Sequence, residues 1–599
     1  MSNITALLKR STFDVIWFFK NLLKTFLSLL VSFGILSGNI SIISPQEIIT
    51  SDYFMQGDST FATSAAVSNY WSVGFSKIII TPVDVLTNAD KYYLAGYGNN
   101  TNPAEVLDDT YVRTLYLDDN SGRGGVIIAV IDAIGLSNKE VLEIRALVAE
   151  FTKANNIKSI NILCTHVHAG IDTQGLWGNI GMLQSGRNEQ YNTYLKGLVA
   201  NSIYMAFENR TKGRLLWGDI LPEQDIFSDN RKPFVYEKSI TRIRFSPLNT
   251  ETDKSDDIYI CTMNAHPENL ALNNTSLSAD FPAYMGRYIA KHTGGVVQAD
   301  GSVSGGAEFV FINGAIGALI NARGLGTVFG IIQNQIRLFD TAPGSDMTNV
   351  EQTAADLNKL LGDTGSKIVS ALNDLTISDL DSQGNLNPDK KTEIRKAFTQ
   401  SYGETIGRYV CEIDNRTEYD ILPFINIRFN SVVIPVENYI LILGAKVGLI
   451  NINSFRSGKL GLDTVITTEA GYLELGNSLK ILLAPGELAP EVAMGGYFSA
   501  QESALGFDIK GKTGFEIINP SDSLDEDGFR RKNLVFGLVN DEIGYILPEN
   551  DFYVHRFLPY VAQENDRFGV GHYEETVSAG PKTAGILLDE WQNIYNLTH

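Results

Sequence analysis

The feature that most constrains the fold is a pair of apolar runs separated by a helix signal. The first run, GVIIAVIDAIGLS (125–137), is typical of a buried strand. Ser137 and Glu140 have the spacing of a capping box, which predicts a helix that continues through VLEIRALVAEFTKAN (141–155). The second run, KSINILCT (158–165), predicts the next strand. A strand, a helix and a strand in this order form a βαβ unit, in which the strands are parallel and the crossover is right-handed.

The pattern of apolar runs that end in polar residues recurs along the chain. The further runs are DIYICTMN (257–264), EFVFIN (308–313), LKILLAPGE (479–487) and NLVFGLVNDEIGY (533–545). Residues 326–415 hold helical patterns instead, which predicts a helical insertion beside the sheet. We therefore expect an α/β fold with a mixed, largely parallel sheet and flanking helices. In such sheets ligands collect beyond the carboxyl ends of the strands.

The N-terminal region has a different character. Four basic residues precede TFLSLLVSFGILSGNISIISPQ (25–46), a stretch of 22 residues without a charge. This pattern predicts a signal peptide or signal anchor over residues 1–46, with a buried core helix as the alternative. Residues 47–70 are polar and read as a linker, so the folded domain is expected over 71–599. We expect the protein to be exported, either secreted or membrane-anchored at the cell surface, where the apolar segment is able to reach a membrane surface.

Composition excludes some classes of function. The chain of 599 residues has 48 Lys and Arg against 69 Asp and Glu, a net charge of -21. Nucleic-acid binding is therefore not expected, because it draws its affinity largely from cationic side chains on phosphates. Three cysteines are too few for a disulfide framework.

Histidines stand where two of the predicted strands end. His166 and His168 follow the strand at 158–165, and residues at i and i+2 of a strand point to the same face. Two converging imidazoles suit zinc, although a hydrogen-bonded structural pair is the alternative. His266, after the strand at 257–264, favours the metal. The set also needs a carboxylate, for which the spacing leaves both Glu487 and Glu268 open.

Several motifs resemble those of a known family. They are THVHAGIDT, NAHPENLALNNTSLSADFPAYM, PGELAPEVAM, GLVNDEIGYILPENDF and HYEETVSAGPKTA. Their order and spacing resemble the neutral/alkaline, non-lysosomal ceramidases, from VGFSKIIITP (73–82) onward over nearly the whole folded region. Enzymes of that family are zinc amidohydrolases that cleave the N-acyl bond of ceramide to sphingosine and a fatty acid.

The resemblance implies roles for individual residues. It implies a zinc ion held by His166, His266, Glu487 and Tyr545. It also implies three catalytic residues, His168, Arg231 and Tyr573. His168 would accept a proton from water and later protonate the leaving amine, while Arg231 and Tyr573 would stabilise the oxyanion.

The sequence also departs from the family. Residues 314–318, from Gly314 to Ala318, lack the serine and aspartate that ceramidases carry after the matching strand. The chain ends soon after the Tyr573 motif, so no C-terminal immunoglobulin-like domain is expected. We expect a substrate that is ceramide or a related N-acyl lipid. The alternatives are a hydrolase of the same fold acting on an N-acyl peptide, amino acid or sugar, and an inactive cell-surface binding protein.

Overall fold

The computed structural model describes residues 68–598 with internal gaps. The gaps are 180–181, 224–225, 249–253, 321–324, 342–351, 354, 358–375, 414, 458–462, 496, 507–508, 511–522 and 525–529. The predicted N-terminal segment 1–46 lies outside the described residues, as does the predicted linker apart from residues 68–70. Among the described residues, no helix is both long and apolar enough to cross a membrane.

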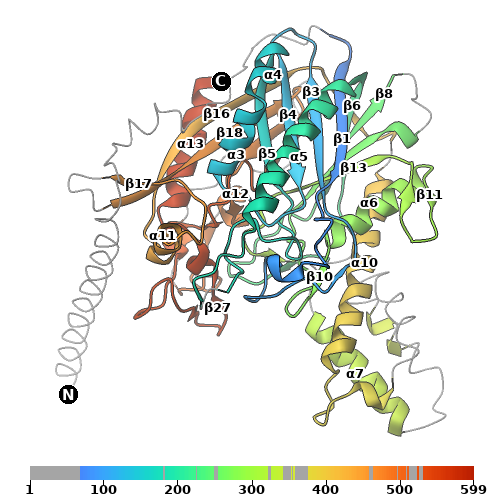
Figure 1. Ribbon diagram of the computed structural model, residues 1–599, viewed down its shortest axis with the longest axis vertical. Helices are drawn as coiled ribbons and strands as arrows, with labels where there is room; N and C mark the ends of the chain where they lie inside the picture. Colours follow the sequence, from blue (N-terminus) through green and yellow to red (C-terminus); the bar gives the residue numbers. More distant parts are fainter. Residues whose placement is uncertain are drawn as a thin grey trace.

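A large mixed sheet forms the first half of the fold (Figure 1). Its strands in spatial order are β13 (Glu308–Asn313), β9 (Ile258–Met263), β8 (Ile240–Pro247), β6 (Thr211–Ile220), β1 (Trp71–Ile79), β3 (Tyr111–Asp118), β4 (Gly125–Ile131) and β5 (Ile157–Cys164). The pair β4–β5 is parallel, which confirms the predicted βαβ unit, and β9–β13 is parallel as well. The strands between these two pairs run antiparallel.

The mixed α/β class is confirmed. The sheet is not largely parallel, however, because most pairs of neighbouring strands in it are antiparallel. Strands β1, β3, β6 and β8, which the sequence patterns above do not indicate, supply the antiparallel pairs. The turn between β3 and β4 shows why one of these pairs is antiparallel. Gly122 and Gly124 adopt φ of 82° and 112°, a conformation that glycine tolerates, and so the chain reverses within a few residues.

A second, smaller sheet packs on the first. Its main strands are β16 (Ile425–Pro435), β18 (Asp463–Leu475), β19 (Leu479–Leu483), β24 (Arg530–Phe536) and β23 (Ser523–Leu524), in that order. Only β19 and β24 are parallel neighbours in this order. The run predicted as one strand over 533–545 ends at Phe536, and Tyr545 begins the separate short strand β25 (Tyr545–Ile546).

The core is organised in four layers of helix, sheet, sheet and helix. Between the sheets, Trp71 and Leu115 of the first sheet pack with Phe429 and Leu473 of the second. The outer face of the first sheet is covered by α3 (Asn138–Leu147) and α5 (Glu189–Glu208), and farther along by α6 (Phe281–His292) and α10 (Pro388–Glu412). Helix α13 (Thr583–Thr598) covers the second sheet. Figure 1 shows α5 lying over strands β3 and β4 of the first sheet.

The helix predictions are borne out in part. Ser137 and Glu140 form the predicted capping box at the start of α3. The predicted single helix is interrupted at Val148, whose φ of -110° lies outside the helical range, and α4 (Ala149–Ala154) follows. In the predicted insertion the described residues include α7 (Leu325–Thr341) and α10. The domain boundaries, and the expectation that no immunoglobulin-like domain follows, stay predictions.

Candidate active site

Segments that follow strands of both sheets meet at one place. The backbone N–H of Gly537, after β24, donates to the carbonyl of Asn313 at the end of β13, with an N···O distance of 2.9 Å. The N–H of His168, after β5, donates to the carbonyl of Pro267, after β9, also at 2.9 Å. These bonds tie the loops that carry the candidate histidines to each other and to the second sheet.

His166 and His168 converge for a different reason from the one predicted. Strand β5 ends at Cys164, so the alternation of faces along a strand does not apply to them. Instead His166 adopts a φ of 59°, in the left-handed region that is unusual for a side chain other than glycine. Its N–H donates to the carbonyl of Ala133 at 3.0 Å, which holds this turn in place. Such backbone strain is typical of functional sites.

Three histidines and one carboxylate form the centre of the site. The ring nitrogens of His166, His168 and His266 provide ligand atoms that all lie within 4.8 Å of one another. Glu487 Oε2 lies 2.9 Å from His266 Nε2 and 3.4 Å from His166 Nε2. Glu268, the alternative carboxylate, lies 3.8 Å from His168 Nδ1 and accepts a hydrogen bond from Tyr97. Glu487 is therefore the carboxylate that faces two histidines at once.

This donor set fits a metal ion. His166 Nδ1 lies 2.7 Å from the carbonyl oxygen of Ile134, so this nitrogen carries the proton and leaves Nε2 free to act as a ligand. Neither ring nitrogen of His168 has a hydrogen-bond partner among the residues that the structure describes. Imidazole nitrogens together with one carboxylate are the ligands of catalytic zinc sites.

The electrostatics of the centre follow from its burial and its charges. Burial lowers the pKa of His168 well below its ordinary value, and the neighbouring His166 and His266 lower it further. Burial alone would raise the pKa of Glu487, but the charges and hydrogen bonds of His166 and His266 hold it well below the usual range. Glu487 is thus an anion able to neutralise part of a cation's charge.

Tyr545 lies directly beside Glu487. The short strands β20 (Glu487–Leu488) and β25 run parallel, with Glu487 opposite Tyr545. The hydroxyl oxygen of Tyr545 is 3.2 Å from that of Tyr573. Burial raises the pKa of both phenols well above 10, and the charge of Glu487 adds to the effect on Tyr545. The structure therefore brings the two sequence-predicted tyrosines together at the histidine cluster.

Arg231, unlike the other predicted residues, lies within a buried group of carboxylates. Its guanidinium is buried and donates to both carboxylate oxygens of Glu575, at 3.2 and 2.9 Å. It also contacts His572 Nδ1 at 2.9 Å and the carbonyl of Asp551 at 2.6 Å. Arg231 is not one of the described residues that line the cavity of the site.

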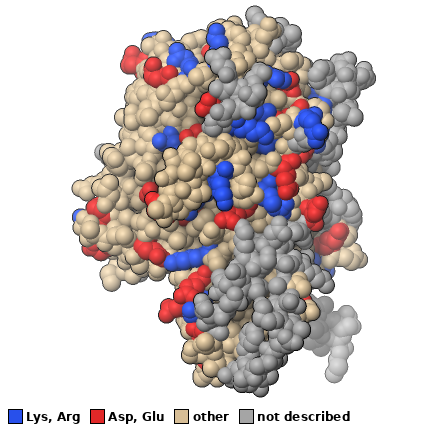
Figure 2. Space-filling model, turned by 90° about the vertical axis from the view of Figure 1, so that its right-hand side faces the viewer, with Lys and Arg blue, Asp and Glu red and all other residues tan. Residues whose placement is uncertain are grey.

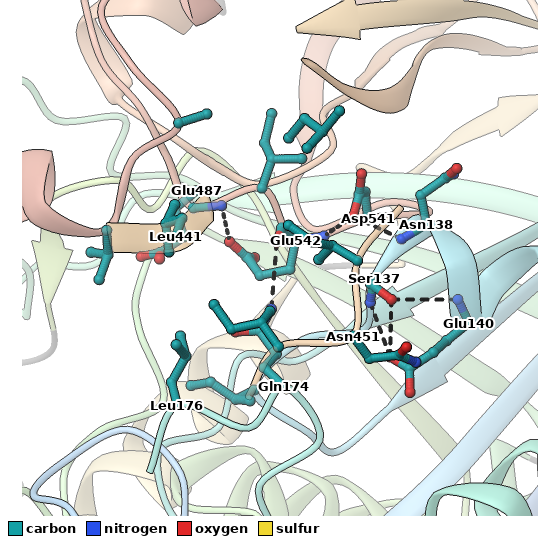
Figure 3. A pocket seen from close by; sticks show the side chains of 18 of the residues that line it. Ser137, Asn138, Glu140, Gln174, Leu176, Leu441, Asn451, Glu487, Asp541 and Glu542 are labelled. Carbon is teal, nitrogen blue, oxygen red and sulfur yellow. Dashed lines mark hydrogen bonds between the residues drawn. The ribbon is translucent and has the colours of Figure 1, made fainter. Parts of the chain in front are cut away.

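A cavity of about 260 Å³ opens onto the histidine cluster. His166, His168, Glu487, Tyr545 and Tyr573 lie in its wall. One part of the lining is apolar and consists of Val436, Leu441, Ile450, Ile452, Ile466 and Ile543. Another part is polar and includes Ser137, Asn138, Gln174, Asn451, Asp541 and Glu542 (Figure 3). The cavity thus combines a hydrophobic wall with a small number of hydrogen-bonding groups, as ligand sites usually do.

Sequence reasoning missed several residues of the site. Tyr97 packs edge-on against His168, with ring centroids 5.2 Å apart, and Gly96 lies against the same histidine. Glu542 and Gln174 line the cavity, although neither ends a strand or forms part of a ligand pattern. A lone polar residue in a loop carries no such signal, so only the folded arrangement identifies it.

The loop that departs from the ceramidase pattern has a structural explanation. A Cβ on Gly314 would lie 1.9 Å from Asn264 Oδ1, which accepts a hydrogen bond from the N–H of Ala315 at 2.8 Å. A Cβ on Gly317 would lie 2.7 Å from the carbonyl oxygen of Glu487. Side chains are therefore excluded at both positions, because the loop packs closely against Asn264 and against the backbone of Glu487.

Comparison with known proteins supports the fold. No protein-family profile matches the sequence, and a search of curated proteins found no match either. The neutral ceramidase from Pseudomonas aeruginosa has a similar structure, with a TM-score of 0.54 and 13% identity over 87% of this chain and 73% of that chain. A ceramidase complexed with C2 gives a TM-score of 0.51 and 12% identity over 87% of this chain and 74% of that chain. The resemblance in the sequence motifs is therefore confirmed at the level of the fold.

Proposed function

We propose that this protein is a zinc-dependent amidohydrolase that cleaves the N-acyl amide bond of ceramide or a related N-acyl lipid. The observation that carries the proposal is the convergence of Glu487 Oε2 on His166 and His266 at the wall of a largely apolar cavity. The neutral ceramidase fold supports the same class of reaction.

In this proposal His166, His266, Glu487 and Tyr545 hold the zinc ion. When bound, zinc supplies Lewis acidity that polarises a carbonyl group and makes a water molecule more acidic. The buried Glu487 carboxylate neutralises part of the positive charge, and its short strand pairing with Tyr545 keeps both side chains in register.

The chain's own residues then handle the proton and the developing charge. His168 has ring nitrogens without partners, so it is the side chain placed to take a proton from water and to return it to the leaving amine. The hydroxyl of Tyr573, next to that of Tyr545, is placed to donate to the oxyanion. Arg231 acts through the buried cluster behind Tyr573, as a positioning residue.

The substrate class follows from the lining. An apolar wall of aliphatic side chains suits an acyl or alkyl chain, which supports a lipid substrate. We extend the proposal to location: the charge-free segment at 25–46 favours export, with the protein secreted or anchored at a membrane where such lipids are found.

The test is release of fatty acid from ceramide and from an N-acyl amino acid by the zinc-loaded protein. We expect release from ceramide, and a loss of about 100-fold or more in kcat for His168→Asn. The variant should keep its zinc, because His168 is not a ligand in this account. Absence of hydrolysis of any amide by folded, zinc-loaded protein would contradict the proposed function and favour a binding protein.

A further inference from the structure

Glu268 is a carboxyl group at the histidine cluster to which the proposed reaction gives no role. Its Oε2 lies 3.8 Å from Nδ1 of His168, and both side chains are largely buried. His168 lines the cavity, whereas Glu268 is not one of the described residues in the cavity wall. Glu268 therefore faces the imidazole from behind, away from the space that a substrate would fill.

Backbone hydrogen bonds bring Glu268 to this place. The N–H of His168 donates to the carbonyl oxygen of Pro267 at 2.9 Å, so the loops that follow β5 and β9 are joined directly beside Glu268. The N–H of Glu268 donates to the carbonyl oxygen of His266 at 3.0 Å, which closes a tight turn around Pro267. The position of the carboxyl next to His168 is thus set by the main chain of both loops.

The hydroxyl of Tyr97 holds the carboxyl at the imidazole. Tyr97 donates to Oε2 of Glu268, the same oxygen that faces His168. The ring of Tyr97 also packs edge-on against the ring of His168, with centroids 5.2 Å apart. Oε2 is a hydrogen-bond acceptor in this arrangement, and a carboxyl oxygen is able to accept from more than one donor. The second donor that it faces is the imidazole.

The ring nitrogens of His168 need such an acceptor. Both are buried, and neither has a hydrogen-bond partner in the described part of the chain. In a neutral imidazole one nitrogen carries the proton and the other accepts, and leaving a buried donor unpaired is costly. A proton on Nδ1 finds Oε2 of Glu268 after a small turn of the ring, and hydrogen bonds of catalytic groups are often long before substrate binds. The geometry therefore favours the proton on Nδ1.

We propose that Glu268 is a positioning residue for His168: it accepts a hydrogen bond from Nδ1–H and so leaves Nε2 as the nitrogen that faces the substrate. This inference rests on the proposed amide hydrolysis. The proton of the water molecule passes to the lone pair of Nε2 and from there to the leaving amine, while the proton on Nδ1 stays in place. Glu268 touches none of the reacting atoms and acts only through His168.

The position of the ring proton is measured by nuclear magnetic resonance. Full-length, zinc-loaded protein with isotopically labelled histidine is compared with the His168→Asn variant, whose missing signals identify those of His168. We expect the proton of His168 on Nδ1 near neutral pH. A proton on Nε2 would overturn the proposal, and this measurement does not require the protein to hydrolyse any amide.

A double-mutant cycle tests whether Glu268 acts through His168. Glu268→Leu removes the acceptor, so we expect kcat to fall by about tenfold or more, with KM within about threefold and zinc content unchanged. In the His168→Asn background the same substitution should change kcat by less than about twofold, because no imidazole is left to orient. Glu268→Gln keeps an acceptor oxygen and is the conservative control, which should retain more activity than Glu268→Leu.

The contrary results are distinguishable from one another. Equal losses of kcat in the two backgrounds would show a structural role for Glu268, and loss of zinc from Glu268→Leu would show a metal ligand; either result overturns the proposal. If Glu268→Leu fails to fold, the position of the ring proton in the parent decides alone. A parent that hydrolyses no amide contradicts the proposed function instead, and the ring proton still tests the contact between Glu268 and His168.

Discussion

At the scale of single residues, close packing around His168 decides how the site is held. Gly96 adopts a φ of 103°, and a Cβ added to it would lie 2.5 Å from both Cβ and Cγ of His168. Tyr97 lies against the same ring and donates to Glu268. The short Gly96–Tyr97 segment therefore fixes the position of His168, the residue that is proposed to transfer the proton.

Gly96→Ala should displace His168 without removing a ligand. We expect kcat to fall by about tenfold or more, because even small displacements in a catalytic geometry are costly, while zinc content is unchanged. Gly98→Ala is the matched control, since Gly98 also has a positive φ of 58° but a Cβ there would meet only Thr101 Oγ1 at 3.8 Å. Equal losses in the two variants would point to backbone strain rather than to displacement of His168.

Arg231 offers a second test at this scale. Its guanidinium is surrounded by Glu575, Glu574 and Asp551, all buried. Arg231→Met leaves these carboxylates without their cation, so we expect a destabilisation of about 3–5 kcal/mol, seen as a lower thermal midpoint. A loss of kcat with an unchanged midpoint would instead support direct contact between Arg231 and substrate.

At the scale of elements, sequence reasoning succeeded where the signals are local. The strand–helix–strand unit was found because the capping box and the two apolar runs are each visible within a few residues. The antiparallel pairs were missed because register between distant strands depends on tertiary packing. His166 and His168 were identified correctly as neighbours of one centre, but through strand alternation rather than the left-handed turn that actually brings them together.

For the remaining site residues, too, local sequence patterns do not reveal contacts between distant segments. Glu487 and Tyr545 came from a family pattern, and the structure places them opposite each other. Glu542 lies three residues before Tyr545 and was passed over, because its place in the cavity wall depends on contacts with Gly135 and Gln174 from elsewhere in the chain. Contacts between segments hundreds of residues apart produce no recognisable pattern in the sequence around either residue.

The packing of α10 on α6 gives a prediction at this scale. A Cβ on Gly403 would lie 2.3 Å from the carbonyl oxygen of Phe281, so Gly403→Ala forces the two helices apart. We expect a loss of about 1–3 kcal/mol in the free energy of unfolding. Gly197→Ala in α5 is the control, because a Cβ there meets no atom within 4 Å and should stabilise by up to about 1 kcal/mol. Thermal midpoints that move in the same direction would contradict the packing described.

At the scale of the whole molecule, the dependence of stability on pH is set by where the charged groups lie and not by the net charge alone. The net charge of -21 is not spread as a uniform acidic surface: on the face shown in Figure 2, Lys and Arg side chains stand among Asp and Glu. Several carboxyls lie inside the protein instead. Burial raises the pKa of Asp229, Asp280 and Asp541 to about 7 each.

From the raised pKa of these buried carboxyls we predict that the stability of the protein decreases as pH rises. Because their pKa is raised on folding from 3.8 to about 7, the folded protein binds more protons than the unfolded chain between these values. The free energy of unfolding should therefore decrease as pH rises from about 4 through 7. Glu575, whose pKa is held at about 2 by Arg231, acts in the opposite sense but only as pH falls below about 4.5.

The measurement is the urea midpoint at pH 5, 6, 7 and 8 with a chelator present, because metal binding itself depends on pH. We expect the midpoint to be highest at pH 5 and Asp280→Asn to flatten the profile. A midpoint that does not fall between pH 5 and pH 8 would contradict the raised pKa of these carboxyls.

The central claim is that His166, His266 and Glu487 hold a catalytic zinc ion, and zinc analysis of the purified full-length protein tests it most directly. After incubation with excess zinc and removal of the unbound metal, we expect about one zinc ion per chain. We expect essentially none in the His166→Ala, His266→Ala double variant. A folded parent protein that retains no zinc would contradict the claim, and the histidine cluster would then be a structural feature of a protein that binds its ligand without cleaving it.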